Sequence, residues 1–252
     1  MFDSEKVIAM LAGKTALVTN VCHFIGVAAA ETLQSHGAKV LCHDQSFGDS
    51  QARADFTGDH PNLTLLSETC TAAAVDAAAE AFGHLDIAVI NDFFPALRAP
   101  IESADLDDFR KGLEALMVVP FATAAAVARH MKPRKQGKLI FVTSAAPVHG
   151  LPNYCMYAAG RGGANAMALS IAKELARDNI QVNAVAPNYV ESESYFPPEL
   201  LADENALAKM ISKVPLGRLG KPHEVGELIA FLASNQSDFM TAQVIPIAGG
   251  WA

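Results

Sequence analysis

Residues 138–163, KLIFVTSAAPVHGLPNYCMYAAGRGG, decide the fold of this chain. The first six residues form an apolar run that predicts a buried strand, and residues 156–178 show a helical pattern. Ser144 directly follows the strand, Tyr157 comes thirteen residues later, and Arg161 follows four residues after that. A spacing of four on a helix puts the phenol and the guanidinium on one face. The stretch therefore brings a hydroxyl, a base and a cation together.

These three side chains suit proton abstraction. A nearby cation favours the phenolate form of a tyrosine, so Arg161 would allow Tyr157 to act as a general base. Ser144 would then hold the substrate oxygen that gives up its proton. Taken alone, a tyrosine and an arginine four residues apart more often indicate a core tyrosine beside an exposed arginine. The rest of the chain has to decide between the two interpretations.

Short apolar runs alternate with helical patterns along the rest of the chain. Such alternation predicts parallel strands that are joined right-handedly by helices. We expect an α/β fold, a single doubly wound, Rossmann-like parallel sheet of about seven strands with helices on both faces, in one domain over residues 1–252. Pro120 should bend or split one long helix. The predicted strands are residues 14–19, 39–43, 63–66, 86–91, 138–143, 181–185 and 243–247, and the predicted helices are residues 25–36, 49–59, 71–82, 113–131, 156–178, 199–212 and 222–234.

Composition and charge exclude several classes of protein. A net charge of -8 and a pI near 5.4 argue against a nucleic-acid partner. No apolar run reaches the length of a membrane helix, and the first ten residues carry acids in place of a signal-peptide core, so we expect a cytoplasmic protein. The four cysteines lack CxxC spacing and are expected to be free, and no metal site is assigned.

Several motifs, in order, resemble the short-chain dehydrogenase/reductase superfamily over nearly the whole chain. They are Ser144, the YAAGR motif at residues 157–161, NAVAP at residues 183–187, and a tail that runs from PLGRLGKP at 215–222 through FLAS at 231–234 to Gly249-Gly250. The resemblance implies the fold predicted above. In the dehydrogenases of that superfamily, it also implies a dinucleotide cofactor at the first turn.

The first turn departs from the superfamily pattern. The dehydrogenases of the superfamily have the pattern Thr-Gly-x-x-x-Gly-x-Gly at this turn, because glycines let the backbone approach a pyrophosphate. This chain reads TNVCHFIG at residues 19–26, with Asn20 and Phe24 in place of the first two glycines and only Gly26 retained. An asparagine tolerates a left-handed backbone. The ring of Phe24 would occupy cofactor space if it pointed inward, although a plain core role is the alternative.

Other positions also argue against hydride transfer. Residues 90–93, INDF, stand where the superfamily has Asn-Asn-Ala-Gly. The helix asparagine of its proton relay aligns with Leu116, which cannot relay protons. Arg161 replaces a lysine that holds the nicotinamide ribose. Asp44 ends a predicted strand where an NAD enzyme has its ribose-binding acid, but a helix cap or turn residue is the simpler interpretation.

A chain that loses cofactor features but keeps Ser144, Tyr157 and a cation resembles the halohydrin dehalogenases, a branch of the superfamily with a Ser-Tyr-Arg triad. CHDQSF at residues 42–47 adds to this resemblance. It implies that Ser144, Tyr157 and Arg161 are catalytic, that a halide pocket replaces the nicotinamide site, and that no cofactor is used. The amides of Asn188 and Tyr189 are expected to form an anion-binding nest.

The same resemblance implies the reaction and the partners. A vicinal haloalcohol closes to an epoxide and releases halide and a proton, and cyanide, azide or nitrite opens the epoxide in reverse. The partners are thus a haloalcohol or epoxide and a halide or small anion, in a homotetramer. The expected halide pocket comprises Phe24, Pro187, Asn188, Tyr189 and Val190, and the expected substrate pocket comprises Asn91, Pro147, Leu151, Tyr195 and Phe196.

Two other functions stay open at this point. One is an NAD(P)-dependent short-chain dehydrogenase/reductase with an altered cofactor turn. The other is a catalytically inactive member that binds a small ligand or acts as a scaffold, against which the intact Ser144 and Tyr157 argue. Asn91 is equally open between a turn residue and a hydrogen-bonding residue behind the pocket.

Overall fold

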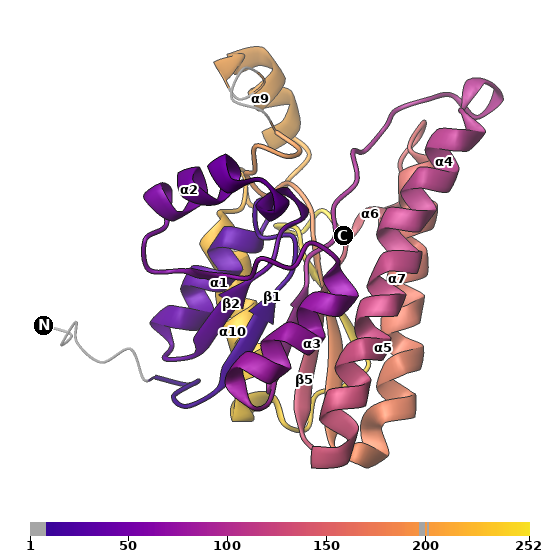
Figure 1. Cartoon of the computed structure of the whole chain (residues 1–252). Coiled ribbons are helices and arrows are strands. Elements are labelled where there is room, and N and C mark those ends of the chain that lie inside the picture. Colours follow the sequence, from indigo (N-terminus) through magenta and orange to yellow (C-terminus); the bar gives the residue numbers. More distant parts are fainter. Residues whose placement is uncertain (1–8, 197–199, 201) are drawn as a thin grey trace, which may run out of the picture.

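The computed structural model of the chain describes residues 9–196, 200 and 202–252. Seven parallel strands form one open sheet in the order β3-β2-β1-β4-β5-β6-β7, with helices on both sides (Figure 1). The predicted fold class is therefore confirmed. The strands are β1 (Thr15–Val18), β2 (Lys39–Cys42), β3 (Thr64–Leu65), β4 (Ile87–Ile90), β5 (Gly137–Val142), β6 (Ile180–Pro187) and β7 (Gln243–Ile247).

Helices alternate with the strands along the chain. The predicted helix 156–178 corresponds to α7 and a short 3-10 turn that follows it. The predicted helix 199–212 overlaps α9, and its residues 199 and 201 lie outside the described residues. The helices are α1 (Gly26–Ser35), α2 (Ser50–Asp59), α3 (Thr71–Phe82), α4 (Leu106–Leu113), α5 (Val119–Met131), α6 (Ala146–His149), α7 (Cys155–Leu175), α9 (Glu204–Ile211) and α10 (Pro222–Ala233).

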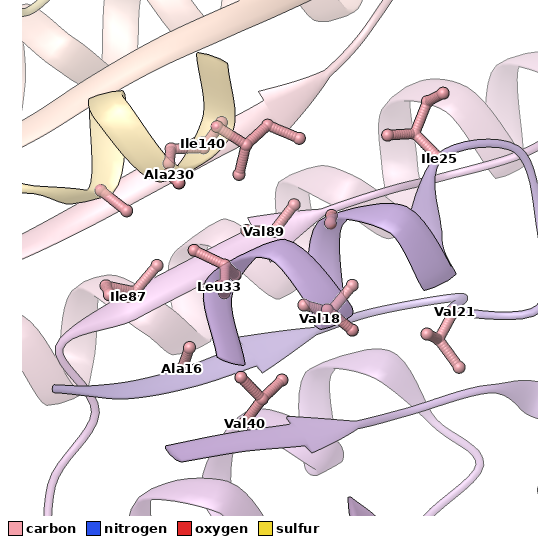
Figure 2. Close-up of a cluster of buried hydrophobic side chains, with 14 of the residues drawn as sticks. Ala16, Val18, Val21, Ile25, Leu33, Val40, Ile87, Val89, Ile140 and Ala230 are labelled. Atoms are coloured by element: carbon pink, nitrogen blue, oxygen red, sulfur yellow. The ribbon is translucent and has the colours of Figure 1, made fainter. Parts of the chain in front are cut away.

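The two faces of the sheet bury alternate residues of each strand. Val18 of β1 lies in the layer formed with α1 and α10, whereas Leu17 lies in the layer formed with α3, α5 and α7. Figure 2 shows the first layer, in which Val40 and Ile87 from the strands lie beside Leu33 of α1. Each fully buried aliphatic side chain contributes roughly 1.5–3 kcal/mol. Two apolar layers thus hold the strand ends in fixed positions.

The long helix begins earlier than predicted. Asp105 accepts hydrogen bonds from the amides of Asp107 and Asp108, so the helix begins at Leu106 and not at residue 113. An aspartate before an apolar periodic run is an N-cap signal that could have located this start. Pro120 does not split the helix. A π-helical segment (Glu114–Val118) precedes α5 and accommodates Pro120, which has no amide hydrogen to donate.

This helix also corrects the expectation about membrane segments. By length and composition alone, the continuous helix Leu106–Arg134 is long and apolar enough to cross a membrane. In the fold, however, Ala124, Val127 and Met131 are buried against the sheet and its neighbouring helices. One face of this helix therefore packs in the core of the α/β fold.

The carboxyl ends of the strands meet at one edge of the sheet. β1 pairs with β2 on one side and with β4 on the other, which opens a crevice where the chain changes direction across the sheet. Asn20 follows β1, Asn91 follows β4, Ser144 follows β5 and Asn188 follows β6. The fold therefore brings the predicted functional residues to a common edge.

Gly26 is required by the packing of the first turn. A Cβ atom at this position would overlap the backbone of Val21, so we expect Gly26→Ala to lower the free energy of unfolding by roughly 1–3 kcal/mol. Gly58 on α2 has open space around it, so Gly58→Ala is expected to be neutral or to stabilise by about 0.4–1 kcal/mol. Urea unfolding measures both variants, and equal stability of the two would contradict the expectation.

Candidate active site

Arg161 is the largest fully buried side chain that the structure describes. Its Nε donates to Tyr157 Oη at 3.3 Å, and its Nη1 donates to the carbonyl of Val142 at 3.1 Å. Its Nη2 donates to the carbonyl of Asp92 at 3.0 Å and to Tyr195 Oη at 2.9 Å. The interpretation of an exposed arginine beside a core tyrosine is therefore wrong. The guanidinium lies inside the protein and holds four oxygens around it.

The arginine remains a cation in this position. Burial by itself lowers the pKa of a guanidinium, but the oxygens of Tyr195 and Tyr157 raise the pKa of Arg161 above its ordinary value. Arg161 therefore cannot accept a proton near neutral pH. It can only stabilise a negative charge that develops on a neighbouring oxygen.

Tyr157 lies one helical turn before Arg161 on α7, as the spacing predicts. The guanidinium carbon lies 5.5 Å from the centre of the Tyr157 ring, and the phenol is half-buried. The hydroxyl therefore combines contact with a permanent cation and partial access from outside. This is the arrangement that a tyrosine base needs.

Ser144 is held at the end of β5 by the same helix. Its Oγ accepts a hydrogen bond from the amide of Ala146 at 3.1 Å, and its carbonyl accepts one from Asn165 Nδ2 at 3.2 Å. Sequence reasoning missed Asn165. Residues 157, 161 and 165 share one helix face at successive spacings of four, and that periodicity could have found it.

Tyr195, expected in the substrate pocket, also hydrogen-bonds to the buried guanidinium. Its Oη accepts from Arg161 and donates to the carbonyl of Phe94 at 3.3 Å. Burial raises the pKa of Tyr195 above its ordinary range, although Arg161 opposes this. The phenol therefore stays protonated and links the segment after β6 to the buried guanidinium.

The first turn folds back on its own protein. Asn20 and Phe24 both have a φ of 49°, in the left-handed region that aromatic residues rarely adopt. The turn amides have acceptors within the protein: Asn20 N donates to His43 Nδ1, Val21 N to His43 O, Cys22 N to Asp44 Oδ2, His23 N to Asn20 O, and Phe24 N to Ser194 Oγ.

A dinucleotide does not fit this turn. A pyrophosphate is held by backbone amides that point toward it without another acceptor, whereas the amides of residues 20–24 already donate to protein oxygens and a ring nitrogen. Asp44 also accepts from the amide of Ser46 at 3.0 Å, which matches the helix-cap interpretation and not a ribose contact. The first turn, as described by residues 19–26, therefore offers no cradle for the pyrophosphate of the cofactor that the dehydrogenases use.

Aromatic rings fill the space in front of the turn. The Phe24 ring packs edge-on against Tyr195 with ring centres 5.0 Å apart, and Phe93 packs against Tyr195 at 5.4 Å. His23 stacks on Phe93 at 4.7 Å. Phe24 therefore points toward the triad through Tyr195, while part of its surface also packs on the main core.

Asn91 and Asp92 lie behind the turn. The Asn91 Nδ2 donates to the carbonyls of Asn20 and His23 at 3.0 and 2.8 Å, so this buried amide holds the turn in place. Asp92 Oδ1 accepts from Asn20 Nδ2 at 2.9 Å. Burial raises the pKa of Asp92 to about 7, although Arg161 and Asn20 oppose the shift.

The loop after β6 does not offer the expected anion-binding nest. Pro187 pairs with Ile247 at the end of the sheet, and the next amide, Asn188 N, donates to Ile247 O at 3.2 Å. The amide of Tyr189 donates to Asn188 Oδ1 at 2.8 Å. The expectation of two free amides is therefore wrong, because strand pairing takes one and the asparagine side chain takes the other. This bond uses Oδ1 of Asn188 and leaves its Nδ2 group as a donor.

Two predicted pocket residues, Tyr189 and Leu151, pack near a tryptophan that sequence reasoning missed. Trp251 packs against Tyr189 with ring centres 5.5 Å apart and against His149 at 4.1 Å. Leu151 packs on the same cluster. Since Trp251 is the single tryptophan of the chain and follows Gly249-Gly250, its position after the last strand was a signal that could have been used.

The other predicted residues lie at the edges of this arrangement. Val190 is buried and bridges to Gly220, and Phe196 stacks on Tyr189 with ring centres 6.4 Å apart. Pro147 packs against the backbone of α7, where a Cβ at Gly162 would meet it at 3.4 Å. Leu116, in place of the relay asparagine, packs on α7 as a buried side chain.

Comparisons with known proteins agree with this fold. A family model described as enoyl-(acyl carrier protein) reductase matches residues 22–252. A 3-oxoacyl-(acyl-carrier-protein) reductase of Vibrio cholerae is 32% identical over 243 residues, which cover 95% of this chain and 98% of that protein. A cis-4-hydroxycyclohexanecarboxylate dehydrogenase of Sinomonas cyclohexanicum is 32% identical over 245 residues, 95% of this chain and 97% of that protein. The chain belongs to the short-chain dehydrogenase/reductase superfamily.

Two solved structures narrow the resemblance within that superfamily. One, described as a dehalogenation enzyme, has a TM-score of 0.93 and 46% identity and covers 96% of this chain and 100% of its own. A halohydrin dehalogenase bound to ethyl (2S)-oxiran-2-ylacetate has a TM-score of 0.90 and 41% identity and covers 94% of this chain and 96% of its own. The resemblance to the halohydrin dehalogenases is therefore confirmed.

Asp92 should make the stability of the protein depend on pH. An aspartate in an unfolded chain titrates near pH 3.9, whereas burial raises the pKa of Asp92 to about 7 in the fold. Between these values the folded protein binds a proton that the unfolded chain has lost. The free energy of unfolding should therefore fall as the pH rises from about 4 to about 7, by at most about 1.4 kcal/mol per pH unit.

Asp92→Asn removes this titration and keeps an oxygen for Asn20. We expect the variant to gain stability relative to the unaltered protein as the pH rises from 5 to 7, and the difference to level off above that range. Urea unfolding at a series of pH values measures it, with Asp59→Asn, the loss of an exposed carboxylate, as the control. A difference that stays constant with pH would contradict the expectation.

Proposed function

We propose that this protein is a halohydrin dehalogenase that needs no cofactor. It converts a vicinal haloalcohol into an epoxide, a halide ion and a proton, and in reverse it opens epoxides with small anions such as cyanide, azide or nitrite. The main support for this proposal is the buried Arg161, which donates a hydrogen bond to Tyr157. In addition, the backbone amides of residues 20–24 in the first turn all donate to acceptors within the protein.

The reaction begins at the substrate hydroxyl. Ser144 and Tyr157 hold this oxygen, and Tyr157 takes its proton as the general base while Arg161 stabilises the phenolate. The alkoxide oxygen then forms a bond to the adjacent carbon as the carbon–halogen bond breaks. The electron pair leaves with the halide, and the proton on Tyr157 passes to water. Electrons are not exchanged with any other group, so the reaction uses no hydride carrier.

The halide leaves into the pocket opposite the hydroxyl. The rings of Phe24 and Tyr189 with Pro187 and Val190 supply polarisable walls. A departing anion also needs a donor. Since the amides of Asn188 and Tyr189 already have acceptors, we assign this role to the Nδ2 group of Asn188.

The carbon chain of the substrate lies on the other side of the triad. Pro147, Leu151 and Phe196 line that side in the proposal, and Tyr195 closes it from within. Asn91 acts as a positioning residue, because its amide is used to hold the main chain of the first turn.

The second candidate function is an NAD(P)-dependent reductase or dehydrogenase. The reductase and dehydrogenase relatives at 32% identity favour it. The closed first turn, Phe24, Leu116 and Arg161 oppose it. A catalytically inactive scaffold is a weaker candidate, since the serine, the tyrosine and the cation are all present.

We also propose that residues 1–252 form one domain that acts in the cytoplasm as a homotetramer. Val118 and Phe121, both on the long helix, are large exposed apolar side chains that suit a contact between subunits. Sedimentation velocity measures the assembly state directly.

The reaction can be tested without any nucleotide. We expect the purified protein to release chloride and acid from 1,3-dichloro-2-propanol in its absence. Chloride release is followed with an ion-selective electrode, and acid release by pH-stat titration. Turnover of a ketone with NAD(P)H in the absence of any halide release would contradict the proposal and support the reductase. Loss of both activities would favour the scaffold.

The base is tested by removing one oxygen. We expect Tyr157→Phe to lower the rate of chloride release by at least ~100-fold, the lower range for loss of a general base, while the thermal unfolding temperature changes little. Tyr154→Phe, which removes a phenol oxygen just before the same helix, serves as the matched control. Substantial activity in Tyr157→Phe would mean that another group takes the proton.

A further inference from the structure

A hydrogen bond joins the segment after β6 to the first turn. The amide of Phe24 donates to Ser194 Oγ at 2.9 Å, across 170 residues of sequence. This is the contact by which the turn gains an acceptor from the segment that carries Tyr195. It lies outside the serine–tyrosine–arginine triad and was not singled out by any sequence motif.

Phe24 depends on this bond for its backbone geometry. Its φ of 49° is unfavourable for an aromatic residue, and such a conformation persists only when its surroundings hold it. The amide is also half-buried, so the loss of its acceptor would leave a donor without a partner. Ser194 therefore stabilises the one conformation in which the Phe24 ring faces Tyr195.

The segment that carries Ser194 is itself a compact turn. The amide of Tyr195 donates to Ser192 O and Ser192 Oγ, both at 3.3 Å, and the amide of Phe196 donates to Ser192 O at 2.7 Å. Ser194 and Tyr195 are adjacent within this turn. A shift of the segment would therefore move the serine hydroxyl and the tyrosine ring together.

One end of this connection, Phe24, belongs to the proposed halide pocket, and the other, Tyr195, closes the substrate side of the triad next to it. The ring centres of Phe24 and Tyr195 lie 5.0 Å apart, and Tyr195 Oη lies 2.9 Å from Nη2 of Arg161. The Ser194 hydroxyl holds the Phe24 backbone, and Ser194 is adjacent to Tyr195 in sequence. The hydroxyl therefore sets the spacing between the Phe24 and Tyr195 rings. The size of the anion pocket therefore depends on a residue that does not itself face the anion.

We propose that Ser194 is a positioning residue for halide recognition, acting through the Phe24 amide to hold the Phe24 and Tyr195 rings at the spacing that fits a halide ion. The inference rests on the proposed function for its ligand. It predicts an effect on anion affinity rather than on the proton-transfer step, because Tyr157 and Arg161 lie on α7 and keep their mutual contact.

The test compares Ser194→Ala with Ser194→Thr, which keeps the hydroxyl. Ser103→Ala is the matched control, since its hydroxyl donates only to a local carbonyl on the surface. Iodide is titrated against the fluorescence of Trp251, the single tryptophan, which lies 5.5 Å from Tyr189. Bromide inhibition, kcat and KM for 1,3-dichloro-2-propanol, and the thermal unfolding temperature are measured on the same samples.

We expect Ser194→Ala to raise the iodide dissociation constant and the bromide inhibition constant by about 3- to 10-fold, the effect of losing one hydrogen bond. The value of kcat should stay within about twofold of that of the unaltered protein, because the substitution removes no hydrogen bond to Tyr157 or Arg161. Ser194→Thr should restore the halide constants, and Ser103→Ala should match the unaltered protein. Amide exchange of the Phe24 N–H should accelerate in Ser194→Ala alone.

Three results would overturn the inference. Unchanged halide constants in Ser194→Ala would show that the bond does not set the pocket. A parallel fall in kcat, halide affinity and unfolding temperature that Ser194→Thr does not restore would show a purely structural role. Unchanged exchange of the Phe24 amide would show that the bond is absent in solution. If the unaltered protein releases no chloride, the proposed function fails, while the iodide titration and the amide exchange still decide the role of Ser194.

Discussion

The burial of one guanidinium is the constraint on which the site depends. Removing an arginine from water costs several kcal/mol unless its donors find acceptors. Arg161 meets this condition with oxygens from four places: the end of β5, the second residue after β4, its own helix, and the segment after β6. Each of these elements is thereby fixed relative to α7. Arg161, whose charge would stabilise a phenolate, thus also joins these four elements by hydrogen bonds and holds them in fixed relative positions.

Much of the fold follows from local patterns. The apolar runs and helical repeats located all seven strands, and the spacing of four placed Tyr157 beside Arg161. The misses are of another kind. The amides of Asn188 and Tyr189 were expected to be free, but one joins the β6–β7 ladder and the other the asparagine side chain. Tyr195 was expected in the substrate pocket, but its hydrogen bond to Arg161 was not foreseen.

These misses share a physical cause. Strand and helix signals arise within about ten residues of sequence, whereas the Asn188–Ile247 and Phe24–Ser194 bonds join residues far apart. Which oxygen satisfies a given amide depends on tertiary packing that no short pattern encodes. Asn165 and the Asp105 cap were different, because their spacing was visible in the sequence. The sequence therefore specified which residues reach the site more reliably than which atoms remain free there.

The first turn shows how the same sheet edge can serve two kinds of chemistry. In a turn that binds a dinucleotide, the amides stay free of protein acceptors until the phosphate arrives. Here His43, Asp44 and Ser194 satisfy those amides when the protein folds, and Asn91 holds the turn's carbonyls from behind. Because the amides of residues 20–24 already have acceptors, a pyrophosphate would have to displace internal bonds as well as the Phe24 ring. Under the proposed function, the crevice takes a smaller anion, held by aromatic walls and one side-chain amide.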